Sequence, residues 1–181
     1  MPNLTSARIF YRNKGDTLVL ASKISLQHMQ KLSIHVERFA DVVKFLLYVL
    51  VPRLFTLSIH FTISSRRIYP GTLYPGNPPE LSQLSSLSIT CTDLRPRPVS
   101  GLIHFLNIMP ELQSLRLSHL TQWGLVVDAL VSTPYPCLGL ALLELGGTSS
   151  WADSLSPHME RLLKHRGPEG VCPIRRIRIA Q

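Results

Sequence analysis

Short apolar segments recur along the chain at nearly regular intervals. Each follows the pattern apolar-x-x-apolar-x-apolar, whose last two apolar positions lie on one face of a short strand, because side chains alternate between faces. The central residues of successive segments are separated by 25, 30, 28, 28 and 34 positions. They are Leu32, Leu57, Leu87, Leu115, Leu143 and Ile177. Six matches at similar intervals predict an internal repeat built on strands.

Between these strands, apolar residues are spaced three or four positions apart, as on one face of an amphipathic helix. Four such stretches lie at residues 42–50, 99–109, 126–130 and 155–163, and each is followed by a proline. Strands that alternate with helices pair in parallel through right-handed crossovers. The predicted fold class is therefore α/β: a leucine-rich-repeat solenoid, or horseshoe, of about six parallel strands with helices on the convex side.

The pattern divides the chain into two parts. Residues 29–181 carry the repeats, interrupted by a loop rich in proline and glycine at residues 64–80. Residues 1–28 are irregular, with an apolar alternation at Leu18, Leu20, Ile24 and Leu26. We expect this segment to form an N-terminal cap of irregular structure or antiparallel strands.

Composition and cysteine usage favour an intracellular protein. The three cysteines, Cys91, Cys137 and Cys172, lie far apart and form no Cys-x-x-Cys pair, which argues against a zinc site and favours reduced thiols. No signal peptide is visible, and the most apolar stretch, residues 42–51, is shorter than the roughly 20 residues of a membrane span. We expect a cytoplasmic or nuclear protein that does not enter a membrane.

No motif of a catalytic or cofactor site is present. The chain contains no Gly-x-Ser-x-Gly, no phosphate-binding Walker sequence and no His-Glu-x-x-His, and its 11 acidic residues are scattered. We therefore expect a protein that is not an enzyme, with no catalytic residue, no cofactor and no metal.

The strand positions between the buried ones form a second face, on the concave side of the sheet. This face is small and polar in its middle and positively charged toward its ends, so we expect it to bind a protein or peptide with acidic or hydroxyl groups. His35 and His60 occupy equivalent positions in adjacent strands, about 4.8 Å apart, where their rings can meet. The predicted partner-binding residues are Lys31, His35, Ser58, His60, Ser88, Thr90, Arg116, Ser118, Glu144, Arg176 and Arg178.

The net charge of +8 makes nucleic acid an alternative partner. Arginines at positions 175, 176 and 178 follow Arg161, Lys164 and Arg166 in sequence. No aromatic residues are interleaved with them and no nucleic-acid-binding motif accompanies them, which favours a solvated basic end. Charged side chains on the last predicted strand discourage edge-to-edge pairing, so we expect a monomer.

Three segments, LSQLSSLSITCTDL, PELQSLRLSHL and PIRRIRIA, together with the helices predicted between them, resemble the leucine-rich repeats of fungal F-box proteins. The resemblance covers about residues 29–181. In that family an N-terminal F-box docks on an adaptor of a ubiquitin ligase, and the repeats select the substrate. The resemblance thus implies that the repeats form the substrate-recognition part of a ligase adaptor.

The chain departs from this family at its N-terminal segment. An F-box typically opens with a Leu-Pro dipeptide and an acidic helix, and no Leu-Pro occurs in the sequence. We therefore expect repeats without the F-box. Two other interpretations stay open: a basic protein that binds nucleic acid, and a truncated paralogue with no ligand of its own.

Overall fold

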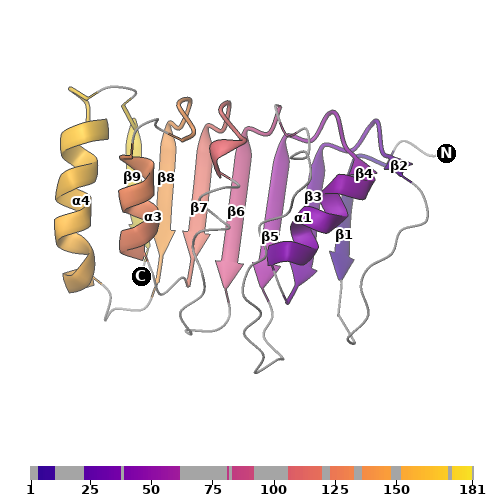
Figure 1. Ribbon diagram of the computed structural model, residues 1–181, viewed down its shortest axis with the longest axis horizontal. Coiled ribbons are helices and arrows are strands. Elements are labelled where there is room, and N and C mark those ends of the chain that lie inside the picture. Colours follow the sequence, from indigo (N-terminus) through magenta and orange to yellow (C-terminus); the bar gives the residue numbers. More distant parts are fainter. Residues whose placement is uncertain are drawn as a thin grey trace.

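Seven parallel strands form the main sheet of the protein. The computed structural model describes residues 4–10, 23–37, 39–61, 81, 83–91, 106–119, 123–132, 136–147, 152–170 and 173–180. Within them the sheet has the order β1-β3-β5-β6-β7-β8-β9, so strands adjacent in the sheet follow one another along the chain (Figure 1). The strands are β1 (Ser6–Phe10), β3 (Lys31–Val36), β5 (Thr56–Phe61), β6 (Ser86–Cys91), β7 (Ser114–Ser118), β8 (Leu142–Gly146) and β9 (Arg176–Ala180).

The repeat residues stack into two continuous apolar ladders. The central positions pair in register from Leu32 on β3 to Ile177 on β9, as the repeat spacing predicts. The second ladder runs two positions further along each strand, through residues 34, 59, 89, 117, 145 and 179. From β3 to β8 every ladder residue is at most 2% exposed. On β9 the ladders open to solvent: Ile177 is half-buried and Ile179 is 54% exposed.

Helices cover the ladder face of the sheet (Figure 1). They are α1 (Phe39–Tyr48), α3 (Trp123–Leu130) and α4 (Ala152–Arg166). Their buried residues, among them Leu46, Val127 and Leu162, belong to the same apolar core as the ladders. None of the described helices is long and apolar enough to span a membrane. The chain is thus α/β with two layers, and it leaves the other face of the sheet to polar side chains.

The N-terminal segment differs from its prediction. β1 pairs in parallel with β3, and the two-residue strands β2 (Ile24–Ser25) and β4 (Val49–Leu50) also pair in parallel, so the expected antiparallel strands are wrong here. The sheet accordingly has seven strands instead of about six. Ala7 and Ile9 take the ladder positions of β1 and pack against the core. Both residues cover the ladders at the β1 edge of the sheet, although neither is one of the leucines from which most of the other strands were predicted.

Two further predictions are only partly tested. Most of the helix predicted at residues 99–109 and all of the loop at 64–80 lie outside the described residues, although Leu106 and Met109 are buried as predicted. On α4, Leu162 is buried but Leu163 is 53% exposed, so the predicted apolar face of that helix is too wide. Only the side of α4 that carries Leu162 packs against the core, and Leu163 lies next to that side.

Arg166 corrects the prediction that the C-terminal basic residues are all solvated. Its side chain is fully buried at the end of α4. Nη1 donates to the carbonyl of Pro136 at 3.1 Å, and Nη2 donates to the carbonyl of Cys137 at 3.0 Å. Buried carbonyls need donors, and the carbonyl of Cys137 also accepts from the backbone N–H of Leu140 at 3.0 Å. Arg166 therefore fixes the turn before β8.

Cys137 itself is a structural residue. Its thiol lies 3.3 Å from the carbonyl of Leu106, to which it donates a hydrogen bond. Burial raises the pKa of this thiol to about 12, although the nearby Arg166 charge opposes the shift. The thiolate is thus disfavoured at neutral pH, and Cys137 is not a reactive nucleophile. Cys91 is also buried.

Leu115 tests the ladder directly, because it lies fully buried between Leu87 and Leu143. We expect Leu115→Asp to unfold the protein, since a buried, unpaired carboxylate costs several kcal/mol and domains are stable by only about 5–15 kcal/mol. Thermal melting followed by circular dichroism measures this. Gln113→Asp, at an exposed position two residues earlier, is the matched control and should melt like the parent. An unchanged midpoint for Leu115→Asp would contradict the assigned register.

Candidate partner-binding face

The open face is our name for the side of the sheet opposite the ladders. Its residues form three rows that cross the seven strands in register. The first row is Ser6, Lys31, Thr56, Ser86, Ser114, Leu142 and Arg176; the second is Arg8, Ser33, Ser58, Ser88, Arg116, Glu144 and Arg178; the third is Phe10, His35, His60, Thr90, Ser118, Gly146 and Ala180.

All eleven predicted partner-binding residues lie on the open face, but they do not form one compact site. Strands β3 and β9, which carry the outermost of them, are five strand spacings apart, or about 24 Å. The exposed members are Lys31, Arg116, Arg176 and Arg178, and the other seven are half-buried. The side chains at the two ends of the face and in its middle also differ in their chemistry.

An aromatic stack occupies the N-terminal end. The rings of His35 and His60 are 4.4 Å apart between centroids and 14° from parallel, so the predicted contact between the two histidines is confirmed. Phe10 extends the stack, 4.3 Å from His35, and is itself 71% exposed. We did not predict Phe10 from the sequence, although Leu4, Ala7 and Ile9 fit the apolar pattern of the other strands, 25 positions before Met29, Leu32 and Ile34.

Burial and nearby charge keep the two histidines neutral. Burial is the main cause that lowers the pKa of His35, followed by the charges of His60 and Arg8. For His60, burial again comes first and Arg8 second. Nε2 of His35 is buried and has no hydrogen-bond partner among the described residues. Because neutral rings are favoured at pH 7, the stack itself presents an uncharged aromatic surface, on strands that also carry the exposed Arg8 and Lys31.

The arginine patch occupies the opposite end, and we define it as Arg116, Leu142, Glu144, Arg176 and Arg178. Arg116 forms an ion pair with Glu144 on the next strand, as their register predicts. Arg178 lies on the other side of Glu144 in the same row, and Arg176 lies beside the half-buried Leu142. The patch thus combines three guanidinium groups, one carboxylate and one apolar side chain.

The middle of the face is lined by hydroxyl groups. Ser58 and Ser88 pair in the second row, and Thr90 and Ser118 pair in the third. Each hydroxyl can donate and accept a hydrogen bond. These side chains are also short, so the floor between the two ends is low enough for a ligand backbone to approach.

No group of three or more histidine, cysteine, aspartate or glutamate side chains that could hold a metal ion occurs in the part of the chain that the structure describes. The two stacked histidines use their ring faces against each other. Their arrangement suits contact with another planar or apolar group.

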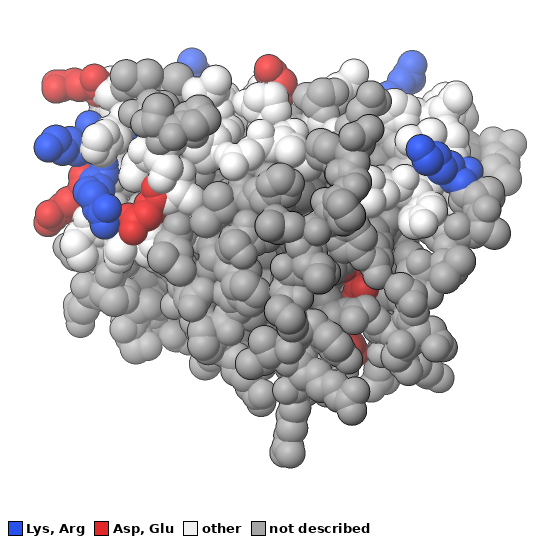
Figure 2. Space-filling model, viewed as in Figure 1, with Lys and Arg blue, Asp and Glu red and all other residues white. Residues whose placement is uncertain are grey.

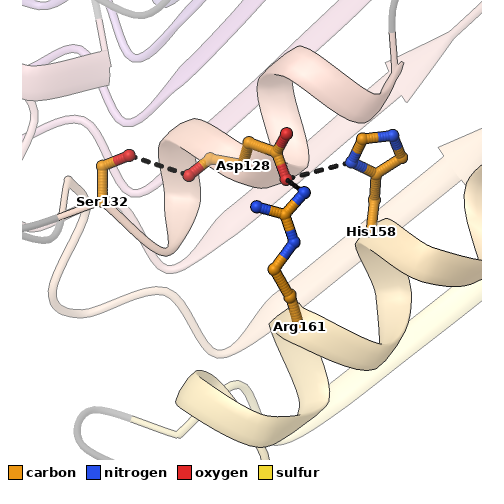
Figure 3. Close-up of polar contacts among 4 residues, drawn as sticks. All are labelled: Asp128, Ser132, His158 and Arg161. Carbon is orange, nitrogen blue, oxygen red and sulfur yellow. Dashed lines mark hydrogen bonds and ion pairs between the residues drawn. The ribbon is translucent and has the colours of Figure 1, made fainter.

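A polar cluster between α3 and α4 was not found from the sequence. A carboxylate oxygen of Asp128 accepts from Nδ1 of His158 at 3.0 Å and from Arg161 Nη2 at 3.1 Å (Figure 3). Charged side chains of both signs gather at this end of the molecule, where α4 lies (Figure 2). The spacing of His158 and Arg161, three positions apart on one helix face, was the available signal.

This cluster holds two helices together. Ser132 caps the end of α3 by donating from its hydroxyl to the backbone carbonyl of Asp128 at 2.9 Å. The imidazole of His158 lies over Gly124, where a methyl group would come within 2.4 Å of Nε2. Glycine at this position therefore provides the space in which the ring reaches Asp128.

Comparisons with known proteins give no family for this chain. No protein-family model, no curated protein and no solved structure matches it. The function therefore has to be argued from the geometry and chemistry of the open face.

Gly124→Ala tests the close packing of α3 and α4. Alanine normally stabilises a helix by about 0.5–1 kcal/mol relative to glycine. Here we expect a loss of about 1–3 kcal/mol, because the new methyl group displaces the His158 ring. Denaturant unfolding measures it. Gly139→Ala, whose methyl would meet nothing closer than 3.4 Å, is the control. When His158→Ala is also present, Gly124→Ala should no longer destabilise the protein. Equal losses of unfolding free energy with and without the His158 ring would contradict the packing.

The histidine stack predicts a dependence of stability on pH. The pKa values of His35 and His60 are lower in the folded protein than their usual value of 6.5, so the unfolded chain takes up protons first. The two neutral histidines contribute their full stabilisation above pH 6.5. This contribution is lost as the pH falls through their pKa values in the folded protein. We expect the melting temperature to decrease between pH 7.5 and 5.5, and His35→Phe/His60→Phe to decrease less. His165→Phe, at an exposed site on α4, should keep the parent's dependence.

Proposed function

We propose that the chain is a leucine-rich-repeat solenoid that acts as a non-catalytic scaffold and binds a protein or peptide on its open face. The observation that carries the proposal is the register of the sheet. It places every ladder residue on the helix-covered side and every predicted partner-binding residue on the other side. A broad polar face, held flat by hydrogen-bonded strands, is suited to contact with an extended partner.

The distribution of ionisable groups supports binding without catalysis. His60 on β5 and Glu144 on β8 are three strand spacings apart, or about 14 Å. A general base must lie within hydrogen-bond reach of the proton that it removes, about 2.6–3.2 Å. These groups are too far apart to act on one bond, whereas a long ligand can contact both ends of the face.

The family that the sequence resembles suggests what the scaffold is for. In F-box proteins the repeats select a substrate for a ubiquitin ligase. We infer that this chain's open face has the same use, the recognition of another protein. Binding of nucleic acid is the alternative, and the Arg176 and Arg178 side chains are the observation that favours it.

A random-peptide display library, selected on the immobilised protein, tests the proposal. Ser58→Arg/Ser88→Arg fills the middle of the open face with bulky charge, and we expect it to weaken the selected peptides at least about tenfold by blocking their contacts. The control Gln27→Arg/His165→Arg adds the same charge at exposed positions off the face and should bind like the parent. Failure to select any peptide, or equal binding to both variants, would contradict the proposal.

A further inference from the structure

We propose that the arginine patch binds an extended peptide segment with acidic side chains at alternate positions. This inference rests on the proposed function, because it names the chemistry of a partner at one end of the open face. Three features of the patch carry it: the spacing of two arginines, the excess of guanidinium groups over carboxylates, and the apolar side chain beside them.

The spacing of Arg176 and Arg178 matches the repeat of an extended chain. The two residues alternate with Ile177 on β9, so both lie on the open face. Residues two apart on a strand are separated by about 6.6 Å. In an extended peptide, side chains at positions i and i+2 have the same separation and also point to one side. Two carboxylates spaced in this way reach both guanidinium groups at once.

The charges of the patch are unbalanced in favour of an anion. Glu144 is only 15% exposed and forms its ion pair with Arg116, whose side chain is 57% exposed. Within the described part of the chain, no ion pair to a carboxylate is formed by Arg176 or Arg178, and both are exposed. Guanidinium groups bind carboxylates with two parallel hydrogen bonds, which adds direction to the charge attraction.

Leu142 favours a peptide over nucleic acid as the partner. It is half-buried beside Arg176, in the row where the other strands carry serine, threonine, lysine or arginine. An apolar centre with a charged rim is the usual composition of a protein–protein contact. The aromatic side chains of the described open face, on which bases could stack, are on β1, β3 and β5, at least three strand spacings or about 14 Å from β8.

Fluorescence anisotropy with a labelled peptide tests the inference. The probe has four glutamates that alternate with serines, and its scrambled counterpart carries the same four glutamates in one block. We expect the alternating peptide to bind more tightly than the block, and to bind less tightly as salt screens the arginines. Arg176→Ser/Arg178→Ser should weaken binding of the alternating peptide about tenfold, because two ion pairs between exposed groups, each modest in strength, are lost.

Arg8→Ser is the matched control. Arg8 is exposed and lies in the same row as Arg178, but on β1, six strand spacings away. It changes the net charge of the protein and leaves the arginine patch intact, so the alternating peptide should bind nearly as it does to the parent. Arg176→Glu/Arg178→Glu should transfer the preference to a peptide in which lysines replace the glutamates.

Three results would overturn the inference. They are equal binding of the alternating and block peptides, equal weakening by Arg8→Ser and Arg176→Ser/Arg178→Ser, and tighter binding of a single-stranded oligonucleotide of the same charge. The first two results contradict this inference alone, provided that peptides from the random library still require Ser58 and Ser88. The third result, together with failure to select any peptide from the library, contradicts both the inference and the proposed function.

Discussion

The structure depends on the stacking of equivalent apolar residues on neighbouring parallel strands. Leu57, Leu87 and Leu115 each contact the same position of the strand before and the strand after, so each is buried only when both neighbours are present. The register is strongly determined, because a slip by one residue would bring the serines of the open face into the core and expose the leucines. Stacking thus sets strand order, register and the side on which the helices pack.

The same constraint separates stability from recognition. Ladder positions accept only apolar residues that fill similar volumes, whereas the alternating positions face away from the core and are free to vary. The second row shows this: Ser58 and Ser88 are followed by Arg116 and Glu144 on the next strands. Function can therefore change by substitution on the open face with little effect on the fold, as expected for surface positions.

Spacing along the chain was sufficient to predict the ladders and the contact between His35 and His60, since parallel register turns equal repeat positions into neighbours. It was insufficient for interactions between segments that do not occupy equivalent positions in the repeat. Arg166 is buried because carbonyls of another segment need its donors, and Asp128 meets α4 through helix packing. Strand β1 escaped prediction because Ala7 occupies the central position, where the other strands have leucine or isoleucine.

The two ends of the open face differ in their chemistry. At the β1 end, Arg8 adds to the cost of protonating the histidines and so helps to keep the stack uncharged. At the β9 end, Glu144 lies between Arg116 and Arg178 in its row and offsets their mutual repulsion, so positive charge can collect there. A ligand that crosses the strands meets an aromatic surface, then hydroxyl groups, then guanidinium groups. Arg8 and Lys31 put positive charge at the β1 end as well, so the aromatic stack, and not charge alone, distinguishes the two ends of the face.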